Sequence, residues 1–158
     1  MIYCEFVRNL LGRRRAGTLV ARKEWGALRR HEDWWRQALR DWQHARHALG
    51  DEDYEWAAFA AHQAAEKAVK ALLQARGIDA WGHSITFLLG SLGEPDRVEP
   101  ALLDAVKDLD RHYIAPRYPD AFPEGAPADY YTKATAEQAL AVAERVLAFV
   151  ADKLQKSP

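Results

Sequence analysis

The residues best suited to chemistry lie in the segment Asp110-Arg-His-Tyr-Ile-Ala-Pro-Arg-Tyr-Pro-Asp120. It combines two arginines, one histidine, two tyrosines and two acids within eleven positions, and its two prolines stiffen the backbone around Arg117. A guanidinium presents a planar fork that can grip two phosphate oxygens. The ring of Tyr113 or Tyr118 could stack on a base. We therefore predict a nucleotide or RNA phosphate site centred on Arg117, whose side chain we expect to start from a restrained position between Pro116 and Pro119.

Other side chains are weaker members of this predicted site. Lys70 could bring charge to a groove between helices, and His83 could donate or accept a hydrogen bond near neutral pH. The predicted nucleotide- or phosphate-binding residues are Lys70, His83, Arg111, Tyr113, Arg117, Tyr118 and Asp120. Each has a structural alternative: a solvated face for Lys70, a helix cap for His83, and a helix C-terminus followed by a proline-bounded turn for residues 111–120.

Metal and covalent chemistry have little support in the sequence. There is no Glu-x-x-His or His-Glu-x-x-His pattern, and the pair His44 and His47 is crowded by arginines, as expected for a solvated helix face. Ser84 directly follows His83, but a helix cap explains this serine better than a nucleophile does. No glycine-rich phosphate loop is present. We predict no metal site and no cofactor.

Composition limits the class of protein. The chain has 158 residues, 49% of them apolar, so we expect one globular domain with a real core. A net charge of −1 argues against coating nucleic acid by bulk charge, but it allows a local basic patch. The single cysteine excludes an internal disulfide, and no apolar run approaches the roughly 20 residues that span a membrane. We expect a cytoplasmic protein without membrane association.

Apolar residues recur at helical spacing along most of the chain. They predict helices over residues 22–49, 53–76 and 85–89, a helix that starts at Pro100 and extends to Tyr113, and a last helix that starts at a capping box at Thr135. No segment alternates like a strand. The fold class is therefore all-α, an antiparallel four-to-five-helix up-and-down bundle formed by residues 22–158, preceded by an N-terminal tail over residues 1–21.

Residues 32 to about 155 resemble a HEPN domain, named for higher eukaryotes and prokaryotes. The matching segments are Asp33-Trp-Trp-Arg-Gln-Ala-Leu-Arg-Asp41, Ala64-Ala-Glu-Lys-Ala-Val-Lys-Ala-Leu-Leu73, Gly82-His-Ser84 and Tyr113-Ile-Ala-Pro-Arg-Tyr-Pro-Asp120. The resemblance implies a helical bundle that is usually a dimer and that binds nucleotide or RNA. It also implies a partner, since many such proteins are encoded beside a minimal nucleotidyltransferase as toxin and antitoxin.

Ribonucleases of this family carry an arginine, four to six variable residues and a histidine late in the domain. Here no histidine follows Arg117, and Arg111 and His112 are adjacent. Arg40 and His47 have six residues between them, but they lie in the first predicted helix, where we interpret the match as chance. The leading interpretation is thus a non-catalytic binding domain. One alternative is a metal-independent endoribonuclease that uses Arg117 with His83 or His112. Another is a non-catalytic dimeric assembly module in which the Tyr/Arg segment is an interface hot spot.

Overall fold

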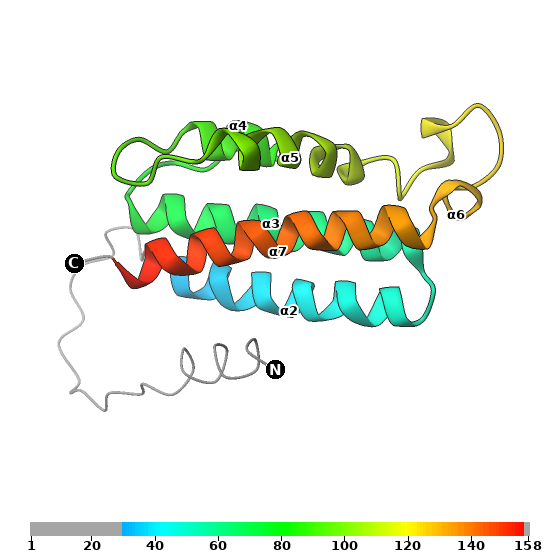
Figure 1. Cartoon of the computed structure of the whole chain (residues 1–158), viewed down its shortest axis with the longest axis horizontal. Helices are drawn as coiled ribbons and strands as arrows, with labels where there is room; N and C mark the ends of the chain where they lie inside the picture. Colours follow the sequence, from blue (N-terminus) through cyan, green and yellow to red (C-terminus); the bar gives the residue numbers. More distant parts are fainter. Residues whose placement is uncertain (1–29, 157–158) are drawn as a thin grey trace.

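A computed structural model describes residues 30–156 of the chain (Figure 1). Four longer helices form the body: α2 (His31–Gly50), α3 (Tyr54–Ala75), α5 (Pro100–Asp110) and α7 (Lys133–Gln155). Two short helices, α4 (Ile85–Gly90) and α6 (Pro127–Tyr130), and the 3₁₀ turns Arg111–Tyr113 and Pro119–Ala121 lie in the connections. The described part contains no strand. The predicted all-α class is confirmed, whereas the predicted tail over residues 1–21 and the predicted helix over residues 22–29 lie outside the described residues.

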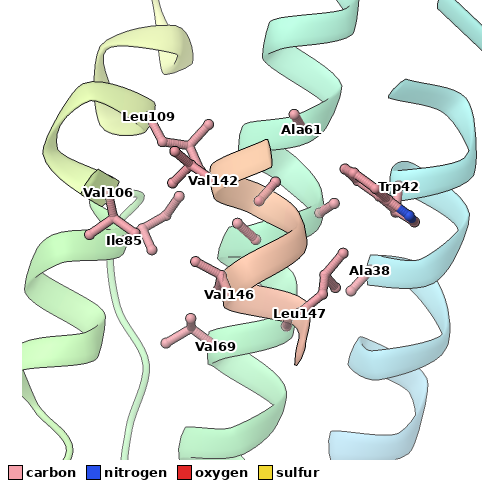
Figure 2. Packing of buried hydrophobic residues seen from close by; sticks show 14 of the residues in the cluster. Ala38, Trp42, Ala61, Val69, Ile85, Val106, Leu109, Val142, Val146 and Leu147 are labelled. Carbon is pink, nitrogen blue, oxygen red and sulfur yellow. The ribbon is translucent and has the colours of Figure 1, made fainter. Parts of the chain in front are cut away.

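The helices alternate in direction and form an antiparallel bundle in which α3 and α7 occupy the middle (Figure 1). α2 packs against one side of this pair, while α4 and α5 pack against the other side. Figure 2 shows the resulting core: Val146 and Leu147 of α7 lie between Trp42 of α2 and Val106 of α5. The predicted four-to-five-helix bundle is thereby confirmed.

Alanine determines how closely the central helix can be approached. Ala58, Ala61, Ala65 and Ala68 of α3 are completely buried. Small side chains let neighbouring helix backbones come near on more than one side, which explains how α3 contacts α2, α7, α4 and α5. At its C-terminal end Leu72 and Leu73 are also fully buried, and burial of each such side chain contributes about 1.5–3 kcal/mol.

The helix boundaries follow local chemistry. The Ser84 hydroxyl caps α4 by accepting a hydrogen bond from the Phe87 N–H at 3.2 Å, and Pro100 occupies the first turn of α5 as predicted. The predicted capping box at Thr135 was wrong by three residues. Thr132 caps α7 instead, because its hydroxyl accepts a hydrogen bond from the Thr135 N–H at 3.2 Å. The helix that starts at Pro100 ends at Asp110 and continues as a 3₁₀ turn to Tyr113.

We expect Ala61→Leu to destabilise the bundle by about 1–3 kcal/mol, because three added carbons have no space between closely packed helices. Urea unfolding measures the loss. The matched control is Ala148→Leu on the exposed face of α7, which should change the free energy of unfolding by less than about 0.5 kcal/mol. Equal stability of the two variants would show that α3 does not need small residues.

Candidate functional site

Three segments far apart in the sequence meet at one side of α3. They are the middle of α3, the residues just before α4, and the 3₁₀ turn with the loop that follows α5. Side-chain contacts among these segments join Glu66, His83, Tyr113 and Arg117, with Lys70 and Tyr118 at the ends. We call these six residues the α3 cluster.

Arg117 is held among aromatic rings. Its guanidinium carbon lies 4.7 Å from the ring centroids of Phe59 and Tyr113 and 5.0 Å from that of Tyr118. Its Nε donates a hydrogen bond to the Tyr113 carbonyl oxygen at 2.7 Å. Within residues 30–156 no carboxylate forms an ion pair with it. Arg117 is therefore partly buried and held in place by these contacts, while its charge is not neutralised by a carboxylate of the described residues.

His83 continues the α3 cluster by stacking on the ring of Tyr113. The two rings stack with centroids 4.3 Å apart and planes 15° apart. The His83 Nδ1 lies 3.1 Å from Oε1 of Glu66, and the His83 side chain remains 53% exposed. When Nδ1 carries the proton and donates it to this carboxylate, Nε2 of the neutral ring is an acceptor.

Glu66 and Lys70 form a buried ion pair one helical turn apart on α3. The Lys70 Nζ lies 2.8 Å from Glu66 Oε1, and the two residues are only 7% and 3% exposed. The alternative of a solvated face for Lys70 was therefore wrong, because this side chain is buried. The Lys70 ammonium also lies 5.6 Å from the ring centroid of Trp34 on α2. Because Glu66 balances its charge, Lys70 positions the carboxylate that holds His83.

Asp110 fixes the start of α4 to the end of α5. Its carboxylate accepts hydrogen bonds from the Ser84 hydroxyl at 2.9 Å and from the backbone N–H groups of Ile85 and Thr86 at 2.6 and 3.1 Å. The fully buried His62 places its Nε2 3.6 Å from Asp110 Oδ1. Burial alone would raise the pKa of Asp110, but these interactions outweigh it and lower the pKa to about 2. Asp110 therefore keeps the segment that carries His83 in place.

The other predicted site residues lie apart from this arrangement. Arg111 is exposed, and its Nη1 lies 3.4 Å from Asp108. Asp120 is exposed in the second 3₁₀ turn. His112 places its Nδ1 2.9 Å from the Tyr131 hydroxyl, and burial lowers the pKa of its imidazole to about 4. Among residues 30–156 no hydrogen bond, ion pair or ring contact joins Arg111 or Asp120 to Arg117.

Several residues that shape the site were not predicted. His62 and Glu66 precede Lys70 at intervals of four residues, so the three share one line along α3. That spacing was visible in the sequence. The contacts that Phe59, Asp110 and Trp34 make with the site were not predicted, because tertiary packing brings these distant residues together. No group of three His, Cys, Asp or Glu side chains that could hold a metal occurs in the described part, and none of its helices is long and apolar enough to cross a membrane.

The fold and sequence together define the class. The chain matches the HEPN domain family over residues 31–154, so it belongs to that family. A protein of Methanocaldococcus jannaschii named "Putative toxin MJ1304" is 28% identical over 130 residues, which cover 77% of this chain and 86% of that protein.

Solved structures show the same arrangement. The crystal structure of TT1696 from Thermus thermophilus is 51% identical with a TM-score of 0.77, and the match covers 80% of this chain and 99% of that one. ST0689, an archaeal HEPN homologue, is 44% identical with a TM-score of 0.65, and the match covers 76% of this chain and 93% of that one. A HEPN domain protein from Thermotoga maritima is 36% identical with a TM-score of 0.64, covering 79% and 99%.

We expect Asp110→Asn to lower the free energy of unfolding by about 1–3 kcal/mol near neutral pH, because the amide has one acceptor oxygen instead of two. The lowered pKa of Asp110 means that its carboxylate stabilises the fold above its ordinary value of 3.8, and that this stabilisation is lost as pH falls toward about 2. Urea unfolding across this range should show the gap between wild type and variant closing in acid. A gap that is constant with pH would contradict this role for the charge.

Proposed function

We propose that this HEPN domain binds the phosphate of a nucleotide or of RNA at the α3 cluster. In this proposal Arg117 contacts the phosphate, Tyr113 and Tyr118 supply stacking surface, and His83 offers a hydrogen bond. Lys70 acts through Glu66, while Arg111 and Asp120 can contribute only from the margin of the site.

The observation that carries the proposal is the environment of Arg117. Three aromatic rings surround the guanidinium and its Nε is used by a backbone carbonyl, which leaves the charge without a carboxylate partner in the described chain. An arginine held in a partly buried position loses little conformational freedom on binding. A phosphate that meets it gains a charge-assisted contact away from bulk water.

The wider function follows from the family and the relatives. We propose that the chain forms a homodimer and works with a minimal nucleotidyltransferase in a two-component, toxin–antitoxin-like system. The relative named as a toxin supports such a context. The exposed side chains of Trp81 and Phe87, 81% and 70% exposed, support a further interface beside the site.

We expect Arg117→Ala to weaken binding of ATP, GTP or short RNA about ten- to a hundredfold, since a charge-assisted hydrogen bond is worth roughly 1.5–3 kcal/mol. Arg117→Lys should retain only part of the wild-type affinity, because the ammonium is a point charge and cannot grip two phosphate oxygens as the planar guanidinium does. Calorimetric titration measures both. The alanine variant should also melt at a lower temperature, because it loses its ring contacts and its bond to Tyr113.

Arg145→Ala on the exposed face of α7 is the control and should leave affinity unchanged. If Arg117→Ala lowers the melting temperature but binds ligand as the wild type does, Arg117 is a structural clamp and the proposed site is wrong.

A second candidate function, metal-independent RNA cleavage, is favoured by the contact between Glu66 and His83. A carboxylate that orients an imidazole is a common arrangement for moving protons. In the late part of the domain, where the family's ribonucleases carry this pair, no arginine is followed by a histidine after four to six residues.

We therefore predict that the purified protein does not cleave single-stranded RNA in the presence of a chelator. Gel analysis of RNA incubated with wild type, His83→Ala and His112→Ala provides the test. Cleavage by the wild type that His83→Ala abolishes would favour the nuclease over the binding domain. His112→Ala is the matched control, because His112 is bonded to Tyr131 rather than to the α3 cluster.

A further inference from the structure

A second basic surface lies along α2, next to Lys70, whose ammonium faces the Trp34 ring. A cavity of about 570 Å³ is open there between the first turns of α2 and the middle of α3. Its lining includes four cations, Arg30, Arg36, Arg40 and Lys67, together with Trp34 and the carboxylate of Asp33. We call these six residues the α2 surface.

Carboxylates balance only part of the charge on the α2 surface. Asp33 is shared, since it accepts hydrogen bonds from Arg30 at 3.1 Å and from Arg36. Lys67 pairs with Asp41. Arg40 donates to the neutral side-chain oxygen of Gln43 at 2.9 Å and forms no ion pair within residues 30–156. The α2 surface is therefore positive although the chain as a whole carries a net charge of −1.

The indole ring of Trp34 indicates that a nucleic acid fits the α2 surface better than an acidic protein segment does. Trp34 is partly exposed within this ring of cations, and its indole also faces the Lys70 ammonium. Cations that follow a backbone and an aromatic side chain on which a base can stack are the two features of surfaces that bind single-stranded nucleic acid. An acidic protein segment would use the cations but would gain less from the indole.

The α2 surface is joined to the α3 cluster through two side chains. Trp34 contacts Lys70, Lys70 pairs with Glu66, and Glu66 contacts His83. A single buried ion pair thus connects the cavity to the cluster that contains Arg117. A strand a few nucleotides long could therefore lie across both surfaces, whereas a mononucleotide would fill only one of them.

We propose that the α2 surface is a second phosphate- and base-binding site, which extends the α3 cluster and makes single-stranded RNA of several nucleotides the preferred ligand. This inference rests on the proposed function, because it assumes that a phosphate binds at Arg117. It adds a site on α2 and a preference for a polymer over a mononucleotide.

The test compares two double variants of the full chain that remove the same charge. Arg36→Gln with Arg40→Gln neutralises the α2 surface, and Arg97→Gln with Arg145→Gln neutralises two exposed arginines elsewhere. Glutamine keeps helix propensity close to that of arginine, and thermal melts confirm that both proteins are folded. The probes are adenosine monophosphate and a fluorescent single-stranded RNA of about ten nucleotides.

We expect the α2 variant to bind the RNA at least about tenfold more weakly than the wild type, with adenosine monophosphate affinity unchanged. The slope of log affinity against log salt concentration should fall by about 1.4, for two lost phosphate contacts to a single strand. The control variant should match the wild type with both probes.

Each other outcome has a distinct meaning. If the α2 variant binds RNA as tightly as the wild type while Arg117→Ala loses RNA binding, this inference is overturned and the proposed function stands. The α2 surface would then suit an acidic protein partner. Equal loss in the control variant, or equal loss of adenosine monophosphate binding, would also overturn it. If the wild type binds neither the RNA nor adenosine monophosphate, the proposed function itself is overturned.

Discussion

The site depends on one buried carboxylate. Glu66 is 3% exposed in the middle of the central helix, and removing such a charge from water costs several kcal/mol unless cations and hydrogen bonds replace the solvent. Lys70 supplies the charge at 2.8 Å, and His83 supplies a further contact at 3.1 Å. Because Lys70 also faces Trp34 and His83 also stacks on Tyr113, satisfying this one group ties α2, α3 and the loop before α4 together.

Arg117 shows the complementary arrangement, a cation whose environment is aromatic rather than acidic. Phe59, Tyr113 and Tyr118 attract the guanidinium through their ring faces without neutralising it. The stacked ring of His83 lies on the same tyrosine. The bundle thus pairs its buried charge internally and leaves a fixed cation beside it, which is the arrangement a phosphate site requires.

The sequence predicted the helices because apolar spacing, Pro100 and Ser84 determine them locally. It also grouped Arg117, Tyr113 and His83 in one predicted site, and the fold brings these three side chains into contact through Tyr113. Predictions from the sequence failed for the side chains whose burial and partners are determined by tertiary packing. Glu66 and Lys70 resemble a surface pair in the sequence, and only the packing of α2 and of the loop before α4 buries them. Arg111 lies six residues from Arg117, but the 3₁₀ turn Arg111–Tyr113 ends between them and Arg111 pairs with Asp108.

The most direct test of the account is a titration of adenosine monophosphate into ¹⁵N-labelled protein, followed by nuclear magnetic resonance. If phosphate binds at Arg117, the Nε–H resonance of Arg117 and the backbone amides of residues 82–84 and 113–118 should shift together along a single binding curve. None of the printed side-chain contacts of the α3 cluster involves α7, so the exposed residues in the C-terminal half of α7 should show no shift. Shifts that spare Arg117 and its neighbours, or that cluster elsewhere on the bundle, would contradict a phosphate site at the α3 cluster.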